Sequence, residues 1–252
     1  MKAICSISIM VAAVALLALG TPVHASEMDD RIELSARKSH VFRSYLGGDD
    51  IKIQSKDGAV TLTGIVSEES RRGLAKETVA GLPGVTSVDN RLEVKGASPT
   101  PNSDAWLGEK VKVTLLFHRN VSAGTTEVDV KNGIVTLRGD AASQAQKELT
   151  TEYAKDIEGV KDVKNEMTVS KTSEMTMARV VGKIDDASIT AQVKMTLLFH
   201  RSTSALNTKV ETNDGVVTMS GKARNAAEKD LVTKLVNDVN GVKSVNNRMT
   251  IE

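Results

Sequence analysis

The sequence predicts an α+β protein of three tandem small α-β-β-α-β units, each a three-stranded mixed sheet covered on one face by two helices. The first observation behind this prediction is a turn motif, Asp-Gly or Asn-Gly before alternating apolar residues, at 57–64, 132–139 and 214–221. The second is a Gly-Val-x-x-Val-x-Asn motif that follows each turn at one constant distance. The third is a pair of helix-spaced apolar patterns, one before and one after each turn. Repetition of this kind is typical of a tandem array.

The turn glycines Gly58, Gly133 and Gly215 give the three copies a common origin. Counted from each of them, matching residues recur without a gap over thirty-six positions. Glycine stands at +6, Gly-Val at +26 and +27, valine at +30, asparagine at +32, and apolar residues at +34 and +36. This many matches in three copies exclude coincidence.

Each unit is predicted to begin with a helix whose apolar residues recur every four positions. The matching residues are Leu107, Val111 and Leu115 in the second unit, and Ile189, Val193 and Leu197 in the third. Asp104 and Asp186 are the predicted N-caps. The first unit is the least regular copy, because His40 and Ala36 stand where the others have leucine and valine. Its core is predicted to be the weakest.

A hairpin is predicted to follow, with its first strand around Ile53, Val128 and Val210. A tight type I′ turn needs positive φ at both central residues, and Asp-Gly or Asn-Gly meets this requirement. The glycine at +6 is predicted to end the second strand.

A crossover helix is predicted between +8 and +26, and it makes the third strand parallel to the second. Its predicted buried faces are Ala145, Leu149, Tyr153 and Ile157 in the second unit, and Ala227, Leu231, Leu235 and Val239 in the third. Ser143 with Gln146, and Asn225 with Glu228, form predicted capping boxes. The glycine at +26 fits a helix C′ position. The asparagines Asn90, Asn165 and Asn247 are predicted to bond to the backbone at the sheet edge, because a buried amide must be satisfied.

Residues 1–25 have the features of a secretory signal peptide, with a basic Lys2, an apolar run from Ile7 to Leu19, and cleavage predicted after Ala25. The rival interpretation is an uncleaved anchor, for which thirteen apolar-rich residues are short. The predicted organisation is then unit 1 at 26–96, a Pro/Ser linker at 97–103, unit 2 at 104–171, a second linker at 172–183, and unit 3 at 184–252. Apolar residues in the second linker favour its docking on a neighbouring unit.

Composition excludes several classes of site. The single cysteine, Cys5, lies in the predicted signal, so the remaining chain has no disulfide, no thiolate nucleophile and no cysteine-ligated metal. The chain has 33 basic and 32 acidic side chains, and aromatic residues make up 2% of it. This balance argues against nucleic-acid binding. No transmembrane segment is predicted once the signal has been cleaved.

The candidate functional surface comes from a second repeated stretch, at the end of the first helix in units 2 and 3. Residues 111–119 and 193–201 are identical at eight of nine positions. Consecutive apolar residues cannot all face one way on a helix, so part of this stretch is predicted to meet a phospholipid or a partner protein. The candidate residues are Leu116, Phe117, His118 and Arg119, with Leu198, Phe199, His200 and Arg201. The alternative is that the helix packs between its own sheet and the next unit, which hides both of its faces.

Histidines and carboxylates give no sign of catalysis. His118 and His200 occupy equivalent positions and are predicted to cap helix ends rather than to bind metal. No nucleophile elbow or phosphate-binding loop occurs, so no catalytic residue, cofactor or metal is predicted and the protein is not expected to be an enzyme. Trp106, the only tryptophan, is predicted to anchor the first linker or an interface.

With these motifs, the chain resembles the BON-domain family. The carrying motifs are the Asp/Asn-Gly-x-Val-Thr hairpin, the helix after it, and the Gly-Val-x-x-Val-x-Asn strand, present three times. The resemblance implies a non-enzymatic periplasmic binding protein of the cell envelope that is associated with osmotic or envelope stress. The implied partners are anionic phospholipids or envelope proteins. The alternative function is a chaperone-like holdase for exported proteins. The better-known osmotic-stress members have two units, and this chain has three.

Overall fold

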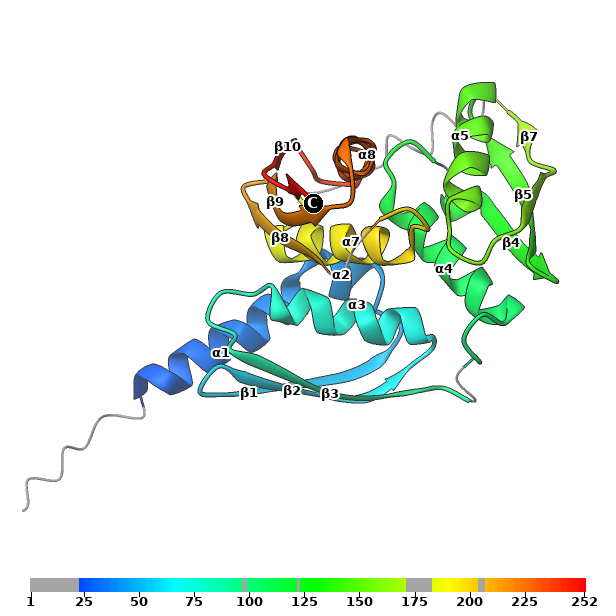
Figure 1. The fold of residues 1–252 in the computed structure, drawn as a ribbon. Helices are drawn as coiled ribbons and strands as arrows, with labels where there is room; N and C mark the ends of the chain where they lie inside the picture. The colour runs from blue at the N-terminus through cyan, green and yellow to red at the C-terminus, as the bar shows by residue number, and fades with distance from the viewer. Residues whose placement is uncertain (1–22, 97–98, 122, 171–182, 204–206) are drawn as a thin grey trace, which may run out of the picture.

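The computed structural model describes residues 23–96, 99–121, 123–170, 183–203 and 207–252, and these residues form three α/β units (Figure 1). The predicted signal peptide lies largely outside the described residues, as does nearly all of the predicted second linker. Helix α1 begins at Val23 and therefore runs across the predicted cleavage point. No described helix combines the length and the apolar character that crossing a membrane requires.

The three units share one order of elements. Unit 1 contains α1 (Val23–Lys38), α2 (His40–Ser44), β1 (Asp50–Lys56), β2 (Ala59–Val66), α3 (Glu69–Ala80) and β3 (Ser87–Val94). Unit 2 contains α4 (Asp104–Phe117), the short 3-10 helix η1 (Ala123–Thr125), β4 (Thr126–Lys131), β5 (Ile134–Ala141), α5 (Gln144–Lys155), β6 (Asp162–Asn165) and β7 (Thr168–Val169). Unit 3 contains α7 (Asp186–Phe199), β8 (Thr208–Asn213), β9 (Val216–Ala223), α8 (Ala226–Asn237), β10 (Ser244–Asn247) and β11 (Thr250–Ile251).

Each unit has the predicted mixed sheet, with the hairpin strands antiparallel and the third strand parallel to the second. In units 2 and 3 the third strand is broken into two short segments that pair with the same central strand. The hairpin tips also agree with the prediction, because both central residues have positive φ, as at Asp57 (53°) and Gly58 (78°). The α+β class and the α-β-β-α-β order are therefore confirmed.

Each hairpin tip is held by a carboxylate from the unit's first helix. Asp104 accepts hydrogen bonds from the backbone amides of Asn132 (2.6 Å) and Gly133 (2.8 Å). The equivalent pairs, with the same geometry, join Asp186 to the amides of Asp214 and Gly215, and Asp29 to those of Asp57 and Gly58. The prediction that Asp104 and Asp186 are N-caps was wrong by one residue, since Ser103 and Asp185 cap these helices. The aspartate one residue further on points out of the helix and anchors the turn.

Replacing Asp104 with alanine is expected to lower the free energy of unfolding by about 1 kcal/mol, because two charge-assisted hydrogen bonds to the turn are lost to water. Urea unfolding followed by circular dichroism measures this loss. Glu152→Ala is the matched control, since Glu152 is exposed and pairs only with Lys155 on its own helix. The control is expected to cost less than about 0.5 kcal/mol. Equal unfolding curves for the two variants would contradict the anchoring role.

Two glycine positions differ from the prediction. The glycines at +26 have positive φ, as at Gly159 (97°), but they follow the crossover helix by several residues and are not at C′. The glycine at +6 does not end its strand. Gly139 (φ 114°) lies inside β5, where a Cβ atom would come within 1.9 Å of the Thr125 carbonyl oxygen. Only the hairpin partner ends there, and β5 continues to pair with β7.

The crossover helices bury the second half of each predicted face, since Tyr153, Ile157, Leu235 and Val239 are buried as predicted and the alanines at the start are not. Ala227 and Ala145 are exposed, and unit 3's own core receives Val232, Val236 and Val239. Of the predicted residues in α8, Leu231 and Leu235 pack instead in the core shared with units 1 and 2. The capping side chains are as predicted, with Ser143 accepting from the Gln146 amide and Asn225 from the Glu228 amide. The Gln146 and Glu228 side chains complete the caps by accepting from the backbone amide of the residue before each N-cap, Ala142 and Arg224 respectively.

The repeated asparagines bond to backbone, as predicted, although their main partner is the crossover helix rather than the sheet edge. The Asn165 amide nitrogen donates to the Lys147 carbonyl (2.8 Å), and its oxygen accepts from the Met167 amide (3.0 Å). Asn90 and Asn247 make the equivalent bonds. These residues therefore fasten the third strand to the helix, and their amide groups are occupied.

Helix α7 lies between unit 3's own sheet and the rest of the molecule (Figure 1). One of its faces, with Ile189, Val193 and Leu197, packs in unit 3's core. The opposite face, with Ala187, Ala191, Met195 and Phe199, packs in the core that units 1 and 2 share. A helix with two apolar faces is expected to be buried on both, which explains the run of consecutive apolar residues apart from the exposed Leu198.

Unit 1 joins unit 3 through a break in its first helix. The break at Ser39 frees the amides of His40 and Val41, which donate to the Asp185 carboxylate (2.7 Å) and the Ser188 hydroxyl (3.0 Å) of α7. His40 therefore occupies a joint between units instead of filling a leucine position in a core. Whether unit 1 has the weakest core stays a prediction.

Candidate functional site at the joint of units 2 and 3

The eight candidate residues form the ends of α4 and α7, and the structure brings both ends into one joint between units 2 and 3. The end of α4 contacts the loop after α8, at 238–242, and the end of α7 contacts the loop after α5, at 156–160. We call these four segments the reciprocal joint. It is isologous in kind, because the same two surfaces meet twice with their roles exchanged.

Backbone hydrogen bonds define this reciprocity. The Arg119 amide donates to the Asp238 carbonyl (3.0 Å), and the Asn240 amide donates back to the Phe117 carbonyl (2.8 Å). On the other side, the Arg201 amide donates to the Asp156 carbonyl (2.9 Å), and the Glu158 amide to the Phe199 carbonyl (3.0 Å). Each helix end thus forms a short antiparallel pairing with the other unit.

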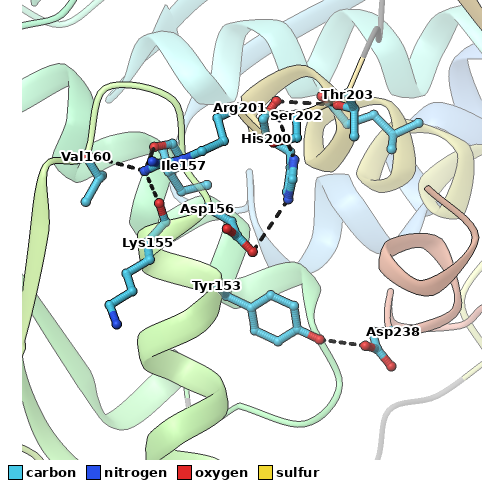
Figure 2. A network of polar contacts seen from close by, with 11 residues as sticks. Tyr153, Lys155, Asp156, Ile157, Val160, His200, Arg201, Ser202, Thr203 and Asp238 are labelled. Carbon is cyan, nitrogen blue, oxygen red and sulfur yellow. Dashed lines mark hydrogen bonds and ion pairs between the residues drawn. The ribbon is translucent and has the colours of Figure 1, made fainter. Parts of the chain in front are cut away.

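The two arginines reinforce the pairing through their side chains. Arg201 Nη2 donates to the carbonyls of Val160 (2.8 Å) and Ile157 (3.2 Å), and also to that of Lys155 (Figure 2). Arg119 Nη2 donates to the carbonyls of Val239 (2.9 Å) and Val242 (2.7 Å). These acceptors lie at and just beyond the C-terminal end of a helix, where free carbonyls and the helix dipole favour a cation.

The two histidines are buried in the joint, and both are C-cap residues, as predicted. His118 is 2% exposed and stacks on the Tyr153 ring, with centroids 3.8 Å apart and planes 9° apart. Its pKa is lowered to about 4, chiefly because burial disfavours the charged ring and despite the nearby Asp238. His200 Nδ1 accepts from the Ser202 amide (3.0 Å), and its Nε2 lies 3.6 Å from the Asp156 carboxylate.

Tyr153 connects the two units directly. Its hydroxyl donates to the Asp238 carboxylate at 2.7 Å, as Figure 2 shows. Burial and this carboxylate together raise the pKa of Tyr153. The Tyr153 hydroxyl therefore stays protonated and keeps its hydrogen bond to Asp238, while the ring keeps its stack on His118.

The joint buries half of the eight candidate residues. Phe117, His118, Phe199 and His200 are buried, and both arginines use their guanidinium groups within the chain. Leu198 differs, since it is 47% exposed. The alternative of a helix hidden between its own sheet and the next unit thus describes the four buried residues, while Leu116 is half-buried and both arginines keep exposed surface.

The sequence analysis missed the receiving loops of the joint. Asp156 and Asp238 both stand 23 residues after the turn glycine, and Arg119 and Arg201 both stand 14 residues before it. Unit 1 has neither, with Gly81 and Ser44 at these positions. Arginine and aspartate occur together in units 2 and 3, and both are missing from unit 1. This pattern could have identified the contact from the sequence.

The described residues contain no group of three or more His, Cys, Asp or Glu side chains placed to hold a metal ion. The histidines of the joint lie within hydrophobic and backbone surroundings, and the carboxylates near them are already bonded or lie on its rim. The arrangement is that of a structural contact.

Comparisons with known proteins agree with the repeat. The family model of the BON domain matches residues 29–96, 103–171 and 185–252. The osmotically-inducible protein Y of Escherichia coli (strain K12) is 35% identical over 144 residues, which cover 57% of this chain and 70% of that protein. The outer membrane lipoprotein DolP of Haemophilus influenzae is 30% identical over 146 residues, covering 57% and 74%. The 21 kDa hemolysin of Actinobacillus pleuropneumoniae is 28% identical over 146 residues, covering 57% and 73%.

Among solved structures, the C-terminal domain of CdsD, a structural protein of the type III secretion system of Chlamydia trachomatis, aligns over 87% of this chain and 96% of its own. The TM-score is 0.22 and the identity 15%, so this likeness carries no argument.

Proposed function

Because the chain belongs to the BON-domain family, with three copies of the domain, we propose that it is a non-enzymatic binding protein of the bacterial cell envelope that docks on anionic phospholipid surfaces. It acts in the periplasm during osmotic or envelope stress. The observation that carries the proposal is its similarity to an osmotically inducible protein and to an outer membrane lipoprotein. The signal-like first 25 residues support export.

The docking surface centres on Leu198, the exposed member of the candidate residues. Lys194 lies one helical turn before Leu198 on α7, so the apolar side chain has a cation beside it, while the Arg201 guanidinium is held by carbonyls of unit 2. Lys194 also pairs with Glu77 of unit 1 at 2.9 Å, which fixes its position. Trp106 lines the same cavity as Leu198, and tryptophan favours the membrane–water interface.

The holdase alternative has less support. Exposed large hydrophobic side chains within the described part of the chain come from several different elements, including Ile65 of β2, Leu198 of α7 and Ile251 of β11. A surface for unfolded clients needs a contiguous apolar patch.

Flotation with liposomes tests the proposal. The purified protein is expected to float with vesicles of anionic phospholipid and not with zwitterionic vesicles, and its recovery should fall as salt screens the attraction. Leu198→Asp is expected to reduce recovery several-fold. Ile65→Asp is the matched control, because Ile65 is 49% exposed but lies on the sheet of unit 1. Equal, negligible recovery with both kinds of vesicle would refute phospholipid docking.

A further inference from the structure

A small cavity lies where the three units meet. Its volume is about 170 Å³, and no single unit encloses it. Gly73 comes from α3 of unit 1, Trp106 and Lys110 from α4 of unit 2, and Met195, Leu198 and Phe199 from α7 of unit 3. Most of these groups are apolar, and Lys110 is the cation among the residues that line the cavity.

Lys110 is a largely buried cation that forms no close ion pair, and the Glu158 carboxylate acts on it from beyond ion-pair distance. The residue is 5% exposed, and its ammonium lies 3.5 Å from the centroid of the Trp106 ring and 5.3 Å from that of Phe199. Within the described parts of the chain, no carboxylate lies within 4.0 Å of its nitrogen, and this nitrogen is not among the fully buried polar atoms that lack a partner, so it faces the open cavity. Burying a charge without a counter-ion is costly, and two ring faces offset only part of that cost.

The fold does not require a cation at this position. The equivalent residue, 23 positions before the turn glycine, is Ser35 in unit 1 and Gln192 in unit 3. Gln192 is fully buried in the matching helix, so the same backbone accepts a neutral side chain of similar length. Lys110 is therefore specific to the unit whose helix faces the cavity with Trp106.

Two carboxylates also line the cavity, and both are engaged elsewhere. Glu69 pairs with Arg72 on its own helix at 3.3 Å. Burial and the neighbouring Glu68 raise the pKa of Glu109, while the backbone amides of Ser70 and Glu69 partly oppose this shift. Neither carboxylate forms an ion pair with Lys110, and Glu158 acts on it only from beyond 4.0 Å, so the ammonium is open to a closer anion.

We propose that this cavity binds one anionic amphiphile, a fatty acid whose carboxylate pairs with Lys110 and whose first methylenes lie against Trp106, Met195 and Leu198. A phosphate would need several donors, and the cavity supplies one cation amid carbon. Sites for drug-sized ligands measure about 300–1,000 Å³, so this cavity holds only the head and first carbons of the chain. The remaining chain leaves past Leu198, the exposed residue at the rim.

Trp106, the only tryptophan, provides a reporter inside the site. Decanoate, added below its micelle concentration, is expected to change the tryptophan fluorescence saturably. Lys110→Met is expected to weaken binding at least tenfold. Lys112→Met is the matched control, because Lys112 is exposed on the same helix, and its affinity should stay within twofold of wild type.

A second variant tests the cavity without touching the charge. A Cβ at Gly73 would meet only the flexible end of Met195, at 3.5 Å, so Gly73→Leu fills the cavity without a backbone clash. It is expected to abolish the fluorescence change while the circular dichroism spectrum stays unchanged.

Three results would overturn the proposal. They are no saturable change with decanoate, equal affinity for decanol, which has the same kind of tail without the charge, and equal affinity for inorganic phosphate. The titration uses no bilayer, so it succeeds or fails independently of vesicle flotation.

Discussion

Replacing both Arg119 and Arg201 with methionine is expected to lower the free energy of unfolding by about 4 kcal/mol. Each guanidinium donates to two or more loop carbonyls of the other unit, and a hydrogen bond from a charged group contributes about 1.5–3 kcal/mol before its solvent exposure is discounted. About 2 kcal/mol per arginine remains after that discount. Urea unfolding of the wild type, both single variants and the double variant gives the coupling between the two sides.

Arg138→Met is the control for this experiment. Arg138 pairs with Glu166 on the surface of unit 2, and both side chains are about half exposed. Its loss is expected to cost less than about 0.5 kcal/mol. If the double variant unfolds at the same urea concentration as Arg138→Met, the reciprocal joint does not stabilise the chain.

Acidification from pH 7 to pH 4 is expected to remove about 3 kcal/mol of stability through His118. Its pKa is about 4 in the folded protein and 6.5 unfolded, so folding favours the neutral ring. The stabilisation is complete above pH 6.5 and is lost as the pH falls towards 4, and a shift of this size corresponds to about 3 kcal/mol. The charged or titratable groups near the ring are Asp238, which favours protonation, His200, which opposes it, and the stacked Tyr153, whose raised pKa keeps it neutral.

The comparison of wild type with His118→Phe isolates this contribution. Phenylalanine keeps the stack on Tyr153 and cannot be protonated. Between pH 7 and pH 4, the variant should therefore lose about 3 kcal/mol less stability than the wild type. Urea unfolding at several pH values measures both curves. His40→Gln serves as the control, because His40 is only half-buried, although burial lowers its pKa too. Parallel curves for wild type and His118→Phe would rule out His118 as the acid-sensitive group.

Local physics made most of the fold predictable. The hairpin tips follow from the steric needs of a tight turn, and the parallel third strand follows from the helical crossover. The tip-anchoring aspartate was within reach of the same method, since Asp29, Asp104 and Asp186 all stand 29 residues before the turn glycine. The sequence favours an N-cap role for this aspartate, because an aspartate at a helix start commonly caps that helix. Its side chain turns to the hairpin tip instead, and that tip is brought opposite it only by the fold.

The candidate site was harder to predict, because its meaning depends on contacts between units. The repeated end of the first helix stands out in the sequence, but a sequence pattern cannot distinguish an apolar surface for a membrane from one for another domain. The three-unit cavity is further from reach, since Gly73, Lys110 and Leu198 come from three units and share no motif.

The reciprocal joint gives units 2 and 3 the relationship of two subunits in a symmetric dimer, although one chain contains both. Each of these units carries both the arginine-bearing helix end and the acceptor loop, so each is complementary to a copy of itself. Duplication of a gene for a single self-pairing unit would give this arrangement directly, because the linker would hold the two copies close enough to pair. Unit 1 lacks both the arginine and the aspartate and attaches through Asp185 and Ser188 instead, so the reciprocal contact is complete without it.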